Sequence, residues 1–146
     1  MNDQQMKSLL KEIKSIAIVG LSPKENRPSN EVARYLMAAG YHVIPVNPGQ
    51  SEILGLPCFP DLTSIGELVD LVDIFRRSGD TPPIVAEALK LSPKPKAVWL
   101  QLGIENSEAA SMAEKAGVPM VMNLCTKIEH RRLLGKIFGG IIPAKL

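Results

Sequence analysis

Residues 16–48 read IAIVGLSPKENRPSNEVARYLMAAGYHVIPVNP, and this stretch decides the fold class. It begins with an apolar run, residues 16–20, which predicts a buried strand. Ser29 then predicts a helix N-cap, and the apolar spacing after it predicts a helix that ends before Gly40. A second apolar run, residues 42–47, predicts another buried strand. A strand, a helix and a strand in this order are typical of a βαβ unit, in which the two strands are parallel.

The same alternation of apolar runs and amphipathic segments continues through the rest of the chain. Because every strand segment is nearly all apolar, both faces of the sheet should be covered by helices. Right-handed crossovers then make the sheet doubly wound. The sequence therefore predicts an α/β fold with a doubly wound, five-stranded parallel sheet. Further strands are expected over residues 71–75, 97–102 and 118–123, and helices over residues 3–14, 64–67, 81–91, 107–116 and 127–136.

Short sequence patterns predict where these helices begin. Ser, Thr and Asn are preferred N-caps because their side chains accept hydrogen bonds from free backbone N–H groups. A Glu three positions after Ser or Thr completes a capping box. The predicted starts are Thr81 ahead of Pro82, Asn106, and the two capping boxes Ser64–Glu67 and Thr126–Glu129.

Length and composition bound the class of the protein. A chain of 146 residues has the size of one domain. We expect a single domain over residues 1–146, with a helix over about residues 3–14 and a core over about residues 15–136. No apolar run reaches the roughly 18 residues of a membrane helix, and the polar first residues lack the apolar core of a signal peptide. We therefore expect a cytoplasmic protein that does not enter a membrane.

Charge and cysteine content argue against two other classes. A net charge of +2 and an aromatic content of 4% are too low for a typical nucleic-acid-binding surface. The two cysteines, Cys58 and Cys125, form no CxxC pair and cannot build a zinc site by themselves. We therefore expect neither a nucleic-acid partner nor a bound metal.

The predicted fold indicates where a ligand should bind. In doubly wound sheets, ligands lie beyond the carboxyl ends of the strands, where the strand order reverses. Polar and basic residues crowd these places in the sequence. The candidate ligand-binding residues are Gly20, Leu21, Ser22, Lys24, Arg27 and Ser29 after the first strand, Val46, Asn47 and Pro48 at the end of the second, Phe75 and Arg76 after the third, and Gln101 after the fourth.

The loop after the first predicted strand carries the clearest signal. Lys24 and Arg27 supply positive charge ahead of a helix whose N-terminal N–H groups attract phosphate. Alternatively, Ser29 is only a cap and the two cations are solvated loop residues. The combination of these residues at this place in the fold favours phosphate binding.

This loop does not match the common nucleotide-binding motifs. It contains one glycine, Gly20, where the dinucleotide fingerprint has three. The second strand ends in VNP, without the Asp or Glu that binds a ribose hydroxyl, which counts against NAD. The chain also lacks GxxxxGK[ST], which excludes a P-loop. The sequence therefore predicts a phosphate-bearing nucleotide held by a longer, basic, glycine-poor loop.

Five motifs in order carry a resemblance to a known family. They are GLSxxxxRPSxxVxxYL from Gly20, GYHVIPVNP from Gly40, VDxVDIFRRS from Val69, VWLQLGIxN from Val98 and AGVPMVMNxC from Ala116. Over about residues 13–133 the chain resembles the small bacterial and archaeal CoA-binding proteins. It is also similar to the CoA-binding domain of the succinyl-CoA synthetase alpha subunit.

The resemblance implies a Rossmann-like fold that holds coenzyme A along the carboxyl ends of the strands. It assigns the candidate residues to three parts of the ligand. Gly20, Ser22, Lys24, Arg27 and Ser29 would hold the CoA phosphates, Val46, Asn47 and Pro48 would lie along the adenosine, and Phe75, Arg76 and Gln101 would line the pantetheine path.

Cys125 is the one candidate for chemistry. It directly precedes the predicted cap Thr126, so the helix dipole should lower the pKa of its thiol. Because CoA ends in a thiol, a mixed disulfide or an acyl transfer is conceivable, whereas most free cysteines simply pack as small apolar side chains. The two histidines offer less, since His42 is expected at the sheet end away from the ligand and His130 on a solvated helix face.

The sequence therefore favours a stand-alone protein that binds CoA or an acyl-CoA without catalysis of its own. One alternative is a thiol-active enzyme or redox protein that uses Cys125 with CoA. A less favoured alternative is an NAD-binding redox regulator. The synthetase alpha subunit has a second domain with a phosphorylated histidine, for which this chain is too short, so we expect no ligase chemistry.

Overall fold

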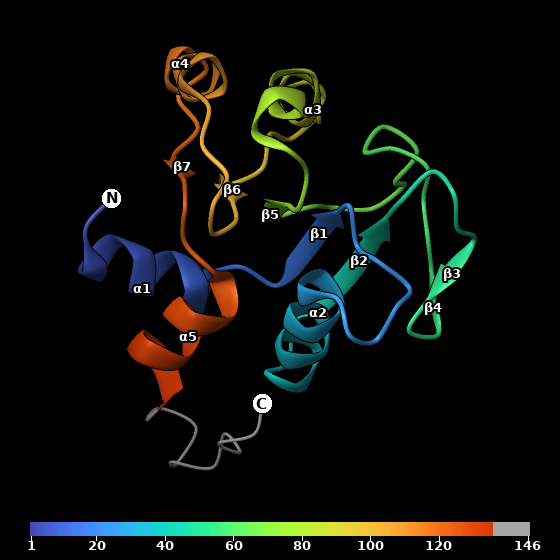
Figure 1. Cartoon of the computed structure of the whole chain (residues 1–146). Helices are drawn as coiled ribbons and strands as arrows, with labels where there is room; N and C mark the ends of the chain where they lie inside the picture. The colour runs from blue at the N-terminus through green and yellow to red at the C-terminus, as the bar shows by residue number, and fades with distance from the viewer. Residues whose placement is uncertain (136–146) are drawn as a thin grey trace.

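Five parallel strands form the centre of the molecule, in the order β2-β1-β5-β6-β7 (Figure 1). The structure, a computed structural model, describes residues 1–135. It confirms the predicted α/β, Rossmann-like fold with a five-stranded parallel sheet. The strands of the sheet are β1 (Ser15–Val19), β2 (His42–Val46), β5 (Leu71–Ile74), β6 (Ala97–Leu100) and β7 (Met120–Val121).

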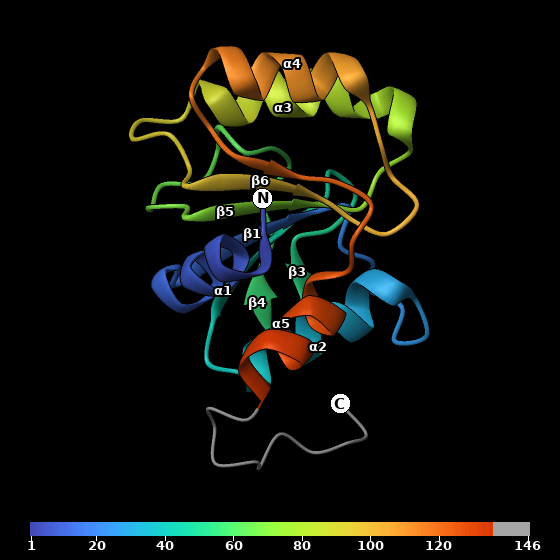
Figure 2. The same ribbon diagram turned by 90° about the vertical axis from the view of Figure 1, so that its left-hand side faces the viewer.

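Helices cover both faces of this sheet, as the doubly wound prediction requires. In Figures 1 and 2, α3 and α4 lie on one face, whereas α1, α2 and α5 lie on the other. None of the helices within residues 1–135 is long and apolar enough to cross a membrane. The helices are α1 (Asp3–Glu12), α2 (Pro28–Ala38), α3 (Thr81–Leu89), α4 (Ser107–Lys115) and α5 (Thr126–Leu134).

Each face of the sheet packs into its own apolar core. On the face of α1, α2 and α5, Ile18 and Trp99 pack with Leu36, and none of the three is exposed to solvent. On the opposite face, Val72 packs with Val85 of α3. Successive residues of a strand point to opposite faces, so strands covered on both sides are apolar at nearly every position. This explains the continuous apolar runs in the sequence. The buried Asp73 of β5 is an exception.

The start of α5 differs from its predicted capping box. Cys125, not Thr126, is the N-cap, and it makes no side-chain capping hydrogen bond. The Thr126 hydroxyl instead donates to Asp73 Oδ2 at 3.0 Å. Glu129 accepts hydrogen bonds from Arg132 on the next turn. Asp73 of β5 has therefore replaced the Thr126 half of the predicted box, and Arg132 of the same helix has replaced the Glu129 half. The predicted end of this helix at residue 136, and the tail after it, lie outside the described residues.

Two further predicted helix starts also differ, and one is confirmed. Asn106 caps α4 by accepting a hydrogen bond from the backbone N–H of Ala109. Thr81 is the first residue of α3 and not its cap, because a short 3-10 helix, η1 (Ser78–Asp80), leads into it. Residues 64–67 do not form the predicted helix. The side chain of Asp61 accepts a hydrogen bond from the backbone N–H of Ser64 and holds this segment as a turn.

The loop after β2 contains two strands that the sequence did not predict. β3 (Glu52–Ile53) and β4 (Leu56–Pro57) pair antiparallel. Leu54 and Gly55 connect them, and both have positive φ angles, of 56° and 75°. A leucine rarely adopts this conformation. The turn is Leu-Gly and not the Asn-Gly that is typical of such hairpins, which is why the sequence did not predict it.

The last strand, β7, is shorter than the predicted segment 118–123.

The predicted solvent exposure of His130 is wrong. Its side chain is fully buried where α5 crosses α2 and the start of β2. His130 Nδ1 lies 2.7 Å from the hydroxyl of Tyr35, and the rings of Tyr35 and Tyr41 both meet the imidazole edge-to-face. Burial lowers the pKa of His130. Its neighbours Lys127, Arg131 and Arg132 suggested a polar helix face, but His130 points inward between them.

We predict that His130 makes the fold sensitive to acid. Because the folded state holds a neutral imidazole, stability falls as the pH drops below about 6.5, where the unfolded chain takes up a proton, by up to about 1.4 kcal/mol per pH unit. His130→Gln keeps an amide for Tyr35 and cannot titrate. Urea unfolding between pH 7.5 and 5 should show the wild type losing stability relative to this variant. Parallel curves would contradict the prediction.

Candidate functional site

Gly20 lies where the strand order of the sheet reverses. β1 pairs with β2 on one side and with β5 on the other. Gly20 follows β1 and donates a backbone hydrogen bond to Val46 at 2.9 Å. Its φ angle is +87°, and a Cβ at this position would lie 2.2 Å from the carbonyl oxygen of Phe75. Only glycine fits here, so the chains leaving β1 and β5 approach each other closely at the place where ligands bind in this class of sheet.

Internal hydrogen bonds hold the loop after β1, residues 20–29 (loop 20–29), in one shape. The backbone N–H of Ser22 donates to Ser29 Oγ at 2.9 Å, and the N–H of Lys24 donates to Ser22 Oγ at 3.1 Å. The buried amide of Asn30 donates to the Ser22 carbonyl at 2.9 Å. Two of these bonds tie Ser22 to the first turn of α2, and the third ties Lys24 to Ser22. The loop therefore does not need to be ordered by a ligand.

The first turn of α2 is not capped by a side chain. Arg27 is the N-cap residue, and Pro28 occupies the first helical position, where proline is favoured. Ser29 is therefore not the predicted cap; its oxygen accepts the hydrogen bond from Ser22 across the loop instead. A helix start without a side-chain cap leaves backbone N–H groups directed at the surface, which favours an anion.

A pocket of about 360 Å³ lies over this helix start. Within residues 1–135, no carboxylate forms an ion pair with Lys24, Arg27 or Arg76. The Arg76 guanidinium lies beside Gly20, since Arg76 Nε would be 3.3 Å from a Cβ there. The pocket thus combines available cations with a helix N-terminus. It is lined by Gly20, Ser22, Lys24, Arg27, Pro28, Ser29 and Phe75.

The end of β2 is joined to this pocket through Asn47. Its side-chain amide donates to the Leu21 carbonyl at 3.0 Å, and its oxygen accepts from the backbone N–H of Gly49. Asn47 is half-buried and Pro48 is exposed, whereas the side chain of Val46 belongs to the core. The structure therefore brings Asn47 and Pro48 to the surface beside loop 20–29. Val46 and the buried Leu21 contribute to this site through their backbone carbonyls, which accept hydrogen bonds from Gly20 and Asn47.

Gln101 lies below the surface, in a buried polar network. Its amide nitrogen donates to Asp73 Oδ1 at 2.7 Å and to Thr126 Oγ1 at 2.8 Å. Burial raises the pKa of Asp73 to about 7, although the hydrogen bonds from Gln101 and Thr126 lower it. Through these two hydrogen bonds the Gln101 amide links β6 to β5 and to the start of α5. The structure does not place it among the exposed groups at the carboxyl end of the sheet.

Cys125 does not have the lowered pKa that its helix position predicted. Burial of the half-buried thiol raises its pKa, and this outweighs the backbone N–H groups of Ile128 and Lys127, which act in the opposite direction. The charge of Asp73 raises it further. A thiol with a raised pKa is a weak nucleophile at neutral pH. The rule for helix N-termini fails here because the N-cap packs against the core.

Several residues that shape this site were not predicted. Asn30 holds Ser22, and Arg34, one turn later on α2, donates to the side chain of Asn30 and to the Glu25 carbonyl. The spacing of Asn30 and Arg34 places both on one face of a helix, which is the signal that could have identified them. Within the described part of the chain, no group of three or more His, Cys, Asp or Glu residues could hold a metal ion.

We predict that Gly20→Ala destabilises the protein strongly. The new methyl group would collide with the Phe75 backbone in a conformation that already disfavours alanine, so the loss should be about 3 kcal/mol or more. Gly117→Ala is the matched control, because Gly117 also has a positive φ angle, +73°, but nothing within 4 Å of the new atom. Its loss should be about 1–2 kcal/mol. Equal losses in urea unfolding would show that the close approach at Gly20 is unimportant.

We also predict that Asp73 destabilises the fold as the pH rises. The folded state favours the protonated acid up to about pH 7, whereas the unfolded chain ionises near pH 4. The unfolded state therefore binds fewer protons in this window, and stability falls between pH 4 and pH 7 by a few kcal/mol, an order-of-magnitude value. In Asp73→Asn this part of the pH dependence should vanish, whereas Asp80→Asn, at an exposed site, should retain it. Unfolding free energies across this range measure both.

Comparison with known proteins agrees with this fold. The family model for the CoA binding domain matches residues 14–131. YneT, an uncharacterized protein of Bacillus subtilis, is 37% identical over 126 residues, covering 86% of this chain and 92% of YneT. A solved structure from Thermus thermophilus has a TM-score of 0.86 at 38% identity and covers 91% of this chain and 99% of its own. A hypothetical protein from Pyrococcus horikoshii reaches 0.88 at 39% identity, covering 92% and 94%.

Larger enzymes contain a similar segment. ADP-forming acetate–CoA ligase I of Archaeoglobus fulgidus is 30% identical in a 141-residue alignment, which covers 90% of this chain but 21% of the ligase. This chain therefore spans about a fifth of the length of that enzyme. The family model covers most of the chain, and YneT is similar over nearly its whole length. This chain thus belongs to the CoA-binding domain family.

Proposed function

We propose that this chain binds coenzyme A or an acyl-CoA at the carboxyl end of its sheet and carries out no chemistry of its own. The observation that carries this proposal is the pocket over loop 20–29. There the uncapped start of α2 meets Lys24 and Arg27, which no carboxylate of residues 1–135 neutralises. Such a site favours a ligand with several phosphate charges.

The charge around the pocket supports CoA over NAD. CoA carries a 3′-phosphate in addition to its pyrophosphate, so more positive charge is needed than for NAD. β2 is followed by Asn47 and not by an acidic residue, and a carboxylate there would repel a phosphate on the ribose. We propose that Ser22, Lys24, Arg27 and Ser29 hold the phosphates.

The remaining candidates divide between the other parts of the ligand. The half-buried Asn47 and the exposed Pro48 lie beside the pocket and suit contacts with the adenosine. Phe75 and Arg76 follow β5 at the switch point, where the pantetheine would pass. We leave the Gln101 side chain out of this set because its amide is bound to Asp73 and Thr126.

A binding role fits the residues better than catalysis does. The raised pKa of Cys125 removes the argument for an activated thiol. His42 lies at the amino end of β2, where it pairs with Glu67, and His130 is enclosed by two tyrosines. None of these groups lines the pocket over loop 20–29. The ligase activity of the larger relative is not part of this proposal.

Calorimetry with CoA, dephospho-CoA, NADH and ATP tests the proposal. We expect CoA to bind most tightly, and dephospho-CoA to bind more weakly because it lacks the 3′-phosphate. Arg27→Ala should weaken CoA binding by about 10- to 100-fold, since a hydrogen bond to a charged group contributes about 1.5–3 kcal/mol. Lys94→Ala, which removes an exposed charge outside the pocket, should leave CoA affinity unchanged.

Two results would count against the proposal. Tighter binding of NADH than of CoA would overturn the ligand class. Equal affinities for CoA and dephospho-CoA would show that Lys24 and Arg27 do not hold the 3′-phosphate. Circular dichroism of Arg27→Ala must match the wild type, so that lost affinity reports the contact and not unfolding.

A further inference from the structure

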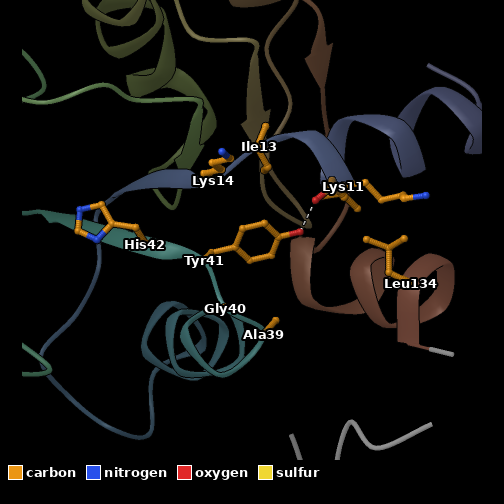
Figure 3. Close-up of a pocket in the computed structure, with 9 residues that line it drawn as sticks. Lys11, Ile13, Lys14, Ala39, Gly40, Tyr41, His42 and Leu134 are labelled. Atoms are coloured by element: carbon orange, nitrogen blue, oxygen red, sulfur yellow. Dashed lines mark hydrogen bonds between the residues drawn. The ribbon is translucent and has the colours of Figure 1, made fainter. Parts of the chain in front are cut away.

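The two hollows at opposite ends of the sheet differ in whether their polar groups already have partners. In the groove at the amino end, which has a volume of about 470 Å³, the hydroxyl of Tyr41 donates to the Leu10 carbonyl (Figure 3). His42, which also lines this groove, pairs with Glu67 at 2.7 Å. At the carboxyl end, the two cations of loop 20–29 form no ion pair within residues 1–135. The way in which this loop presents its charges therefore decides which ligand it attracts.

Loop 20–29 carries its charges on a tight turn. The backbone N–H of Arg27 donates to the Lys24 carbonyl at 3.1 Å, which closes a β-turn with Glu25 and Asn26 at its tip. Such a turn brings the Cα atoms of its first and last residues within about 7 Å of each other. Lys24 and Arg27 both line the pocket, whereas Glu25 and Asn26 do not. The turn therefore separates two positive charges that face the pocket from the one negative charge of the loop.

Arg34 holds the tip of this turn from the side of α2. Its Nε donates to Asn30 Oδ1 and its Nη2 donates to the Glu25 carbonyl, both at 2.9 Å. The buried side chain of Asn30 in turn donates to the Ser22 carbonyl at 2.9 Å. Arg34 is therefore linked to the tip of the turn directly and to the start of the loop through Asn30.

This pair of contacts uses the geometry of an arginine. The guanidinium group is planar, so the directions of its Nε and Nη2 donors are fixed relative to each other. These two donors meet a side-chain oxygen one helical turn earlier and a backbone oxygen of the loop at the same time. A lysine has a single ammonium group on a flexible stem and lacks this fixed fork. The contacts of Arg34 therefore depend on its shape as well as on its charge.

We infer that Arg34 is a positioning residue, which holds loop 20–29 so that Lys24 and Arg27 face the ligand and Glu25 does not. The inference rests on the proposed binding of CoA phosphates and adds the residue that orients the loop for them. A carboxylate turned toward the pocket would repel a phosphate there. Arg34 itself does not line the pocket, so it acts on the ligand through the loop.

Calorimetry with CoA on three variants tests this role. Arg34→Met should weaken CoA binding about 10-fold, as expected when the loop adopts its binding shape only about a tenth of the time. Arg34→Lys should weaken it to a similar extent, because the charge stays but the fork is lost. Lys90→Met, which removes an exposed charge at the end of α3 on the opposite face, should leave CoA affinity unchanged. Wild-type affinity in Arg34→Lys would overturn the inference.

A second substitution shows whether Glu25 is the group that Arg34 keeps away from the ligand. In the wild type, Glu25→Gln should change CoA affinity by less than about 2-fold, because the carboxylate faces away from the pocket. In the Arg34→Met background, Glu25→Gln should recover affinity by at least about 3-fold, since the released loop lets the carboxylate approach the phosphates. A merely structural role of Arg34 predicts no recovery. Equal effects of Glu25→Gln in both backgrounds would contradict the inference.

Hydrogen exchange without ligand separates this inference from the proposed function. The backbone N–H groups of Ser22 and Arg27 are hydrogen-bonded within the loop, so their exchange reports its opening. Arg34→Met should speed the exchange of both by about 10-fold, whereas Ile18 in β1 should keep its wild-type rate. Unchanged exchange in the loop would overturn the role of Arg34. Failure of the wild type to bind CoA would overturn the proposed function, and the exchange rates would still decide whether Arg34 holds the loop.

Discussion

The close approach of Gly20 to the Phe75 carbonyl is the constraint on which the rest of the site depends. A side chain at position 20 would meet that oxygen at 2.2 Å, so the chain can leave β1 beside β5 only through glycine. This contact lies where the strand order reverses, and it sets the starting direction of loop 20–29. Arg76, which directly follows Phe75, is brought beside Gly20 by the same approach. The contact between Gly20 and Phe75 therefore brings Arg76, which follows β5, next to the predicted phosphate-binding loop 20–29.

From this starting point, short polar contacts shape the site in advance of any ligand. Ser22, Ser29 and Asn30 hold loop 20–29 against α2, and Asn47 joins it to the end of β2. These hydrogen bonds satisfy the loop's own groups and leave the charges of Lys24 and Arg27 facing solvent. A site organised in this way loses less conformational entropy when a ligand binds.

The buried titratable groups that contact α5 act mainly on the stability of the fold. Asp73, with Gln101 and Thr126, anchors the start of α5 to the sheet, and His130 with Tyr35 anchors the middle of that helix. Each of these anchors contains a titratable group whose charged form is disfavoured by burial. The stability of the α5 side of the molecule is therefore linked to pH in two opposing ways. The predicted phosphate-binding loop contains no such buried acid or histidine.

The sequence by itself determined the fold class, the order of the main elements and the residues of loop 20–29, because apolar periodicity and turn residues are local signals. Only the tertiary structure decided the roles of Thr126, Gln101, Cys125 and His130. Thr126, Cys125 and His130 were interpreted from their neighbours in sequence, as a cap, a candidate reactive thiol and a solvated residue. Gln101 was interpreted from its place after a predicted strand. In the structure, groups from distant elements surround or bind each of these four residues. Burial and long-range hydrogen bonds depend on how helices pack on the sheet, and local sequence patterns do not specify that packing.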